Sequence, residues 1–406
     1  MRKVIVLTFA AVAAVSTIAA SVAGADSTRV ASPAAPNCKL ATIALTGPYT
    51  GPAGTAGLDQ RNWGRVFISN WNAGKPIPGV PAGFKRTKLK AVEADTQLNP
   101  QVAATVAVQL RSNKDLLAVN GFSGSQENIA GGPILRRGGV AFVSGSATRA
   151  SLTDPTTPDG SVLKSGFFRR VVPTDKRQGA TDAAFVMNKL GVGRGDKVMT
   201  VDQAEAYSVP LISLITQILD GAGVDVDRQS QPAAQTDFTA LANRAIAQKA
   251  KVVVLGTQVA SNAQLFYQQL KSKGFSGDFL ATDGAFDSSQ FTAPGPYISS
   301  FSLDIHDVPV AKPFVTEFEK KYGQTISFGA PSFVAVQAIA MGISTACADG
   351  KVSRGEVRGE IGKVKMKNSL LGKPIAFDKF GDVVGGVGFT IFQIGSGGQY
   401  NVVQKG

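Results

Sequence analysis

The sequence predicts an α/β protein made of two doubly wound lobes, each with a parallel sheet covered by helices on both faces. From Leu40 onward, short apolar runs alternate with amphipathic segments, and such alternation favours parallel sheets. Of the 406 residues, 44% are hydrophobic, which suits a chain of about two domains with their own cores. The predicted strands are more numerous than one sheet easily holds, so two sheets are the simpler arrangement.

Each element is predicted from its own pattern. Apolar runs between turn residues predict strands at 40–45, 89–93, 116–120, 140–143, 167–172, 197–201, 224–228, 252–255 and 279–281. Apolar residues at three- and four-residue spacing predict helices at 57–71, 100–111, 126–136, 181–190, 210–219, 238–247, 262–273, 313–322 and 332–348. After Pro100, for example, Val102, Val106 and Leu110 share a helical face, and proline is tolerated in a first turn.

The charge of the chain is high but dispersed. Its formal net charge is +13, although only 17% of residues are charged. The basic residues form short clusters, such as 136–137 and 320–321, between apolar strand residues and without a set of aromatic residues for stacking on bases. A solvated basic surface is therefore favoured over nucleic-acid binding, and we expect no nucleic-acid partner.

The N-terminus resembles a secretory signal. Arg2 and Lys3 precede an apolar run over 4–22, and Ala23-Gly24-Ala25 supplies the small residues of a cleavage site. We expect residues 1–25 to be a signal peptide, 26–37 to be a flexible tether, and the mature protein to be periplasmic or extracellular. An uncleaved membrane anchor is the alternative, and we expect no later stretch to be long and apolar enough to cross a bilayer.

Two cysteines remain after export, Cys38 and Cys347. An even number of cysteines in an oxidising compartment permits a disulfide, whereas two buried unpaired thiols are the alternative.

The sequence lacks the common catalytic and metal-binding motifs. His306 is the only histidine and lies in a loop with Asp304 and Asp307, where a surface role is more usual than catalysis. The sequence contains no HExxH, P-loop, GxSxG or CxxC motif. We therefore expect neither an enzyme nor a cofactor or metal site.

Hydroxyl-bearing turns follow three predicted strands. They are 121–125, which ends in Ser123-Gly124-Ser125, 145–148, which contains Ser146 and Thr148, and 282–284, which contains Asp283. Such turns lie at the carboxyl ends of parallel strands, where open α/β sheets bind ligands. The first can hold a carboxylate and the third offers an acidic group. The alternatives are that Ser125 caps its own helix and that Asp283 only makes a turn.

At these residues the chain resembles the type I periplasmic binding proteins of the leucine/isoleucine/valine-binding class, the solute-capturing subunits of ABC importers. The resemblance runs from about 38 to 395 and rests on the order and spacing of four motifs. These are Gly47-Pro48-Tyr49-Thr50-Gly51-Pro52, Glu93-Ala94-Asp95 with Asn99-Pro100, Gly121-Phe122-Ser123-Gly124-Ser125, and Gly145-Ser146-Ala147-Thr148.

The resemblance implies a set of ligand-binding residues. Ser125 and the turn containing Ser146, Ala147 and Thr148 would hold the carboxylate and ammonium of an amino acid. Asp283 would complete the ammonium site.

The resemblance also implies the walls around this site. Tyr207 would close over the ligand, Phe328 would form an apolar wall, and Tyr49 and Gln258 would also line the site. Ala56 and Gln258 fall where branched-chain binders carry aromatic residues, so the side-chain subsite is expected to be wider or more polar.

The family fold further implies a three-segment hinge that closes like a Venus flytrap. Placing the crossings near Val171, Ser302 and Phe377 gives lobe 1 as 38–170 and 304–377, and lobe 2 as 171–303 and 378–406. Both cysteines then share lobe 1, which makes the disulfide as well supported as two unpaired thiols.

The expected function is that of the substrate-binding subunit of an ABC transporter, a monomer that captures a branched-chain or related amino acid and presents it to a membrane permease. One alternative ligand is an aromatic or aliphatic carboxylate without an amino group, which Asp283 would repel. The same sequence features are also compatible with a ligand-sensing ectodomain and with a secreted hydrolase.

Overall fold

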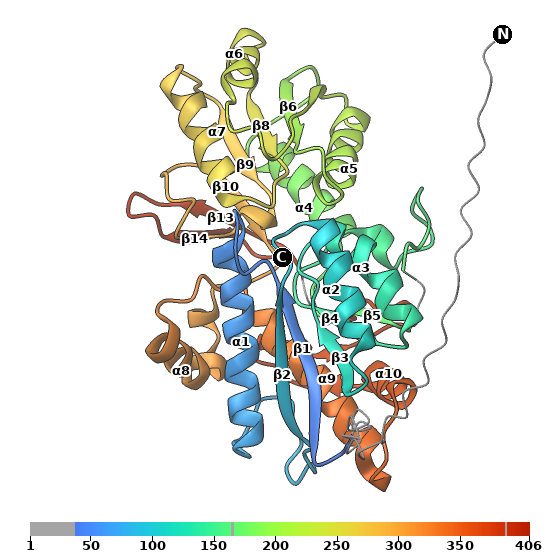
Figure 1. The fold of residues 1–406 in the computed structure, drawn as a ribbon. Helices are drawn as coiled ribbons and strands as arrows, with labels where there is room; N and C mark the ends of the chain where they lie inside the picture. Colours follow the sequence, from blue (N-terminus) through green and yellow to red (C-terminus); the bar gives the residue numbers. More distant parts are fainter. Residues whose placement is uncertain (1–36, 164–165, 386–387) are drawn as a thin grey trace, which may run out of the picture. The chain divides into compact units, whose positions relative to one another are not determined.

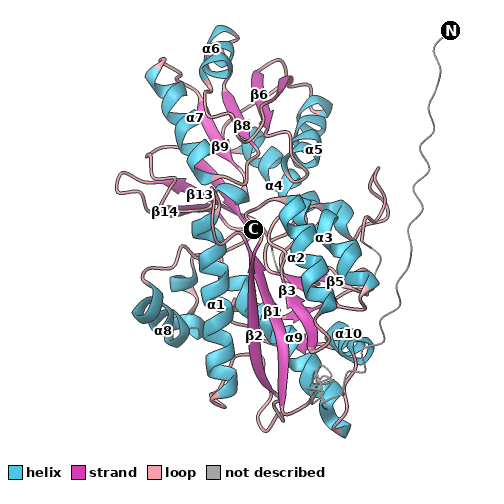
Figure 2. Cartoon of the chain, in the orientation of Figure 1, coloured by secondary structure: helices cyan, strands magenta, loops and turns pink. Residues whose placement is uncertain are grey.

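The computed structural model describes residues 37–163, 166–385 and 388–406. The predicted signal peptide, and the tether up to residue 36, lie outside the described residues. The described residues confirm the predicted class, because they form two α/β lobes, each built on its own sheet (Figures 1 and 2).

The first sheet has five parallel strands in the order β2-β1-β3-β4-β5. The strands are β1 Leu40–Gly47, β2 Lys88–Asp95, β3 Leu116–Asn120, β4 Ala141–Ser144 and β5 Phe168–Arg170. The surrounding helices are α1 Gly54–Asn72, α2 Pro100–Ser112, α3 Ser125–Arg137, α8 Lys312–Tyr322, α9 Ala330–Ala346 and α10 Arg354–Lys363. Alternate residues of β1 pack on opposite faces: Ile43 packs in the cluster with α1 and α9, and Ala44 in the cluster with α2 and α3.

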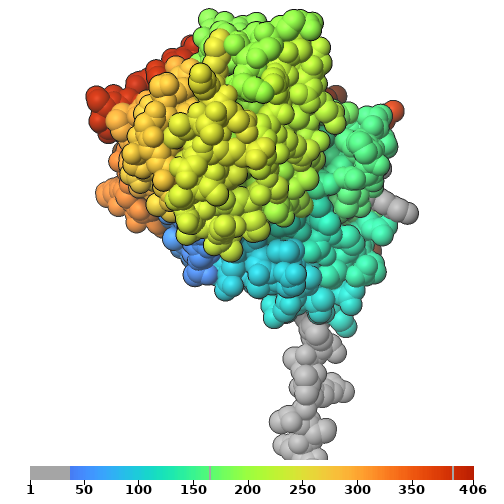
Figure 3. All heavy atoms as spheres, turned by 90° about the horizontal axis from the view of Figure 1, so that it is seen from above, coloured from blue at the N-terminus to red at the C-terminus, as the bar shows by residue number. Residues whose placement is uncertain are grey.

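The second sheet has seven strands in the order β14-β13-β10-β9-β8-β6-β7. The strands are β6 Lys197–Asp202, β7 Asp225–Ser230, β8 Val252–Leu255, β9 Asp278–Ala281, β10 Tyr297–Ser300, β13 Thr390–Ile394 and β14 Tyr400–Gln404. The strands β13 and β14 pair antiparallel at one edge. The helices α4 Asp175–Asn188 and α5 Ser208–Gly221 cover one face, and α6 Thr239–Ala247 and α7 Ala260–Ser272 cover the other. Parts of this lobe, coloured green to yellow, form much of the face seen in Figure 3.

The predicted elements are all present, with shifted ends, but several others were not predicted. These are β10, β13, β14, α10 and the two-residue strands β11 Lys365–Met366 and β12 Ile375–Ala376. The largest shift is in α4, which begins at Asp175 and not at residue 181. Its first two turns carry buried polar residues, so they show no apolar periodicity.

The helix α9 corrects one expectation from the sequence. The segment Ala330–Asp349 is long and apolar enough to cross a membrane by length and composition, but most of it is buried in the protein. It packs against α1, β3 and α10, so its apolar residues form part of the first-lobe core. At its end, Cys347 forms a disulfide with Cys38, which precedes β1.

The last segment of the chain lies against the first sheet before it joins the second. The backbone N–H of Arg170 at the end of β5 donates to the carbonyl of Gly381 at 3.0 Å, and the Arg170 side chain bonds Asp382 at 2.7 Å. These contacts place residues 381 and 382 against β5 of the first sheet. The lobe boundaries near residues 171, 303 and 377 stay predictions.

Candidate functional site

A cavity of about 40 Å³ lies between the two lobes. It is lined by Pro48, Ala53, Ala56, Gln60, Leu98, Ser123, Ser125, Ser146 and Thr148 of the first lobe, by Tyr207, Gln258, Asp283 and Gly284 of the second, and by Phe328. The sheets place the predicted turns here because the carboxyl ends of their parallel strands face one another. Seven predicted ligand-binding residues meet in this cavity: Ser125, Ser146, Thr148, Tyr207, Gln258, Asp283 and Phe328.

The first-lobe wall includes hydroxyl groups that follow β3 and β4. The Thr148 Oγ1 atom is buried and has no hydrogen-bond partner among the described residues. The Ser146 Oγ donates to the carbonyl of Ser123 at 3.0 Å, which ties the two turns together. The Ser123 Oγ donates to the Gln60 side chain on α1. An unpaired buried hydroxyl is costly, so Thr148 is suited to bond a ligand atom.

The side chain of Ser125 does not cap its own helix. The helix α3 begins at Ser125, and the residue at its N-cap is Gly124. The Gly124 N–H donates at 2.6 Å to the carboxylate of Glu127, which takes the capping role instead. The Ser125 Oγ has one long contact, with the N–H of Arg149 at 3.4 Å. The hydroxyl of Ser125 thus remains available on the cavity wall, at a helix N-terminus where anions are favoured.

The second-lobe wall is centred on Asp283 and Tyr207, whose hydroxyl donates to the Asp283 carboxylate. Both side chains are buried, and Asp283 begins a short 3-10 helix after β9. Burial raises the pKa of Asp283 to about 7, although the hydrogen bond from Tyr207 acts in the opposite direction. Gly284 is needed here because a Cβ atom would lie 2.4 Å from the carbonyl oxygen of Thr257.

Further buried acids lie behind this wall. Burial raises the pKa of Asp175 to about 8, with a smaller contribution from the charge of Asp283. Neither carboxylate oxygen of Asp175 has a hydrogen-bond partner among the described residues. Burial also raises the pKa values of Asp182 and Glu205. The second-lobe side of the cleft therefore holds acids that favour a proton or a cationic group nearby.

The remaining wall is formed by Phe328, which is held by α1. Asp59 on α1 accepts from the N–H of Gly329 at 2.7 Å and from Thr325 Oγ1 at 2.8 Å, which fixes the segment around Phe328. On its other side, Phe328 packs on Phe301, with ring centroids 5.3 Å apart. Phe328 is thereby an apolar wall between the cleft and the segment that leaves β10.

The two lobes are closed on each other in this structure. The Gln258 Nε2 of the second lobe donates to Gln126 on α3 at 3.0 Å and to Glu205 at 2.7 Å. The Arg149 Nη1 of the first lobe donates to the carbonyl of Ala206 at 2.5 Å. A cavity of about 40 Å³ holds only a few water molecules, so a solute enters only if the lobes separate. The wider subsite expected from Ala56 and Gln258 is not open in this closed form.

Two predicted residues do not line the cavity. The Ala147 side chain is buried in the first-lobe core, and its carbonyl accepts from Arg170 at 3.1 Å. Tyr49 turns its ring toward Arg61, whose guanidinium carbon lies 5.2 Å from the ring centroid. The motif that contains Tyr49 contributes Pro48 and, further on, Ala53 to the wall.

Sequence reasoning missed Gln60, Leu98, Pro48 and Ala53 as lining residues. Gln60 lies on the buried side of α1, but helical periodicity alone does not tell a core position from one that faces a cleft. Leu98 precedes the Asn99 N-cap of α2 and has a φ of 55°, a conformation that is uncommon for leucine. Its position beside a cap was the one available signal.

Within the described residues there is no group of three or more histidine, cysteine, aspartate or glutamate side chains arranged to hold a metal ion.

A family model described as "Periplasmic binding protein" matches residues 41–399. The chain belongs to this family. Among curated proteins, this periplasmic binding protein is similar to an "Amino acid binding protein" of Pseudomonas aeruginosa, with 24% identity over 321 residues, 77% of this chain and 81% of that protein.

Solved structures of this fold resemble the chain closely in architecture. The isoleucine-bound branched-chain amino acid transporter substrate-binding protein LivJ of Streptococcus pneumoniae matches with a TM-score of 0.74 and 21% identity, covering 90% of this chain and 100% of LivJ. A fatty acid ABC transporter substrate-binding protein of Thermomonospora curvata matches with a TM-score of 0.77 and 17% identity, covering 91% and 93%. These likenesses show the type I periplasmic binding protein fold.

Proposed function

We propose that this periplasmic binding protein captures an amino acid between its lobes and presents it to the membrane permease of an ABC importer. The observation that supports this most is the pairing of the Thr148 and Ser125 hydroxyls on one wall with the Asp283 carboxylate on the other. A zwitterion offers a carboxylate to the hydroxyls and an ammonium to the acid. Burial of both charges is favourable only when both are paired.

In this proposal the first lobe binds the carboxylate, and closure of the second lobe brings Asp283 and Tyr207 to the ammonium. The hydrogen bonds of Gln258 and Arg149 across the cleft stabilise the closed form. A permease then distinguishes closed from open protein, because the ligand shifts the equilibrium between two lobe arrangements. The protein acts outside the cytoplasm, as a monomer and without turnover of its ligand.

The alternative solute, a carboxylate without an amino group, is favoured by one observation. Because burial raises the pKa of Asp283 to about 7, this side chain is partly protonated at neutral pH and is then able to donate a hydrogen bond to a carboxylate. The structurally similar protein of Thermomonospora curvata is described as a fatty acid ABC transporter substrate-binding protein, and fatty acids are carboxylates without an amino group.

A thermal-shift screen of residues 26–406 against amino acids, fatty acids and benzoate separates the two candidates, because a ligand that binds the folded state raises the melting temperature. We expect α-amino acids to stabilise the protein. We expect Asp283→Asn to weaken amino-acid binding by about 2 kcal/mol, which is roughly 30-fold. The control Asp220→Asn makes the same charge change at an exposed position at the end of α5. A shift with carboxylates alone would contradict the amino-acid proposal.

A further inference from the structure

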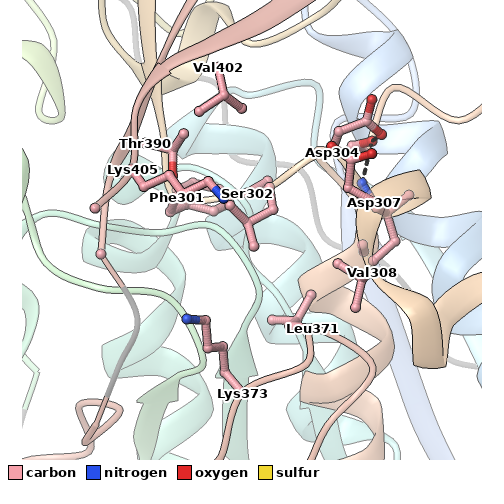
Figure 4. Close-up of a pocket in the computed structure, with 16 residues that line it drawn as sticks. Phe301, Ser302, Asp304, Asp307, Val308, Leu371, Lys373, Thr390, Val402 and Lys405 are labelled. Atoms are coloured by element: carbon pink, nitrogen blue, oxygen red, sulfur yellow. Dashed lines mark hydrogen bonds between the residues drawn. The ribbon is translucent and has the colours of Figure 1, made fainter.

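A second and larger cavity, of about 260 Å³, lies where the chain passes between the lobes (Figure 4). It shares no lining residue with the interlobe cleft. Its walls come from 301–308 after β10, from 371–373, from the start of β13 and from the end of β14. We name it the hinge cavity.

The hinge cavity is lined by two lysines, together with Asp304, Asp307 and the C-terminal residue Gly406. Neither Lys373 nor Lys405 forms an ion pair with a described residue, and both line the cavity. In Figure 4, Lys405 is directed toward Ser302, and Lys373 enters from another wall. The Ser302 Oγ is buried, with the residue 2% exposed, and has no hydrogen-bond partner among the described residues. The Lys405 ammonium and the unpaired Ser302 hydroxyl suit one anionic head group, and Lys373 adds positive charge to the same cavity.

The remaining walls are mostly apolar. They include Phe301, Val308, Leu371 and Val402, and the neighbouring Leu303 and Val402 are exposed to 36% and 40%. Exposed apolar residues around a cavity are typical of a binding site. The acids Asp304 and Asp307 lie on the opposite side from Lys405 in Figure 4, and Asp304 is already bonded to His306. These acids disfavour a second negative charge on the ligand.

The hinge cavity is connected to both lobes and to the cleft. Ile305 and Val308 belong to the first-lobe core, whereas Phe301 belongs to the second-lobe core. Phe301 also packs on Phe328, which lines the cleft on the other side. A molecule that fills the hinge cavity thus contacts the segments whose conformation sets the angle between the lobes.

We propose that the hinge cavity binds a small amphipathic monocarboxylate, whose head group bonds Lys373, Lys405 and Ser302, and that this binding shifts the equilibrium between open and closed lobes. The binding step is independent of the solute in the cleft. The effect on solute capture rests on the function proposed above.

Calorimetric titration of residues 26–406 with octanoate tests the binding step. Octanoate should bind at least about tenfold more tightly than 1-octanol or octylammonium, which have the same chain without the negative charge. The double variant Lys373→Gln/Lys405→Gln should weaken octanoate binding by about tenfold or more. The matched control, Lys249→Gln/Lys351→Gln, removes two exposed lysines elsewhere and should not change it.

The cleft variant Asp283→Asn distinguishes the two sites, because octanoate in the hinge cavity does not touch this residue. Octanoate binding that changes in Asp283→Asn but not in the hinge double variant would place the ligand in the cleft and overturn the proposal. Absence of octanoate binding to the wild-type protein would also overturn it. Melting curves establish that each variant is folded, and Ser302→Ala, which should also weaken octanoate binding, supplies a second test that keeps both lysines.

Small-angle X-ray scattering tests the effect on the lobes without any solute in the cleft. Octanoate should change the radius of gyration of the wild-type protein but not that of the hinge double variant. An unchanged radius of gyration at saturating octanoate would overturn the regulatory step. If no amino acid binds in the thermal-shift screen, the function proposed for the cleft fails, while the octanoate titration still decides the hinge site.

Discussion

Amino-acid binding should weaken steeply below pH 7 because Asp283 has to lose a proton to pair with the ammonium of the solute. The pKa of Asp283 is raised to about 7 by burial in the empty cleft. An ammonium group about 3 to 4 Å away would lower that pKa again because it stabilises the charged form. Binding therefore releases a proton wherever the empty site is protonated.

The size of the effect follows from the same value. If binding releases one proton, Kd rises about tenfold for each pH unit below the pKa, which is about 1.4 kcal/mol of binding free energy. From pH 8 to pH 5 the affinity should fall by about 100-fold, or about 2.7 kcal/mol, with most of the change below pH 7. Asp175 and Glu205 lie in the same buried cluster, so their titration adds to this loss.

Calorimetric titration at pH 5, 6, 7 and 8, in buffers with different heats of ionisation, measures both the Kd and the number of protons released. Asp283→Asn should bind more weakly and show a smaller pH dependence, whereas Asp220→Asn should behave like the wild type. A carboxylate without an amino group should show the opposite sign, because it binds the protonated form. An amino-acid Kd that stays constant from pH 5 to pH 8 would refute the role given to Asp283.

Three further predictions concern the free energy of unfolding. The empty protein should be more stable at pH 5.5 than at pH 8.5, as measured by its melting temperature, because burial raises the pKa of Asp175 to about 8. At a pH between the unfolded pKa of Asp175, near 4, and its folded pKa, the folded state binds more protons than the unfolded state, so stability falls as the pH rises. A melting temperature that rises with pH over this range would contradict the prediction. Arg170→Met should cost about 3–5 kcal/mol in urea unfolding, since Arg170 is fully buried and bonds Asp382, whereas a loss below about 1 kcal/mol would show that the pair is dispensable. Replacing Cys38 and Cys347 by serine should cost at most about 6 kcal/mol for a separation of 309 residues, and equal unfolding midpoints with and without reductant in the wild-type protein would contradict this.

The elements that follow an apolar pattern were predictable, and those that serve the site were less so. The start of helix α4 was predicted six residues too late because Asp175, Gln178 and Asp182 are buried on its inner side, against the usual rule for polar residues. Such departures are expected where function, and not packing, selects the residue. The helix α10 was missed for another reason, because it buries only Val357 and Ile361.

A local signal for α10 was present in the sequence. Ser353 and Glu356 form a capping box, in which the Glu356 N–H donates to the serine hydroxyl at 3.2 Å and the Glu356 carboxylate accepts from Ser353 at 2.7 Å. The missed strand β14 alternates little, because three of its five residues are exposed at a sheet edge. Pairing with β13 places it there, and pairing between distant segments is not visible in a local pattern.

The candidate site was predictable in its turns but not in its side walls. The hydroxyl turns and Asp283 were found because each follows a strand that is clear in the sequence. Gln60 lies on a helix, and Leu98 lies three residues beyond the end of β2, so neither follows a strand directly. Tyr49 shows the converse error, because it belongs to a correctly placed motif yet its ring packs against Arg61.

The net charge of +13 suggests an attraction for anions, but the residues around the cleft point to a different basis for selection. Arg170 is a buried arginine that bonds Asp382 and the carbonyls of Ala147 and Arg149. Its positive charge favours the charged form of Asp175, but burial outweighs this effect and the pKa of Asp175 stays raised to about 8. The described residues of the cavity wall include no lysine or arginine. In the function proposed above, a proton on these acids in the empty cleft is exchanged for the ammonium of the solute in the loaded cleft. Under that proposal, selection for zwitterions over simple anions depends on this exchange at Asp175 and Asp283 and not on surface charge.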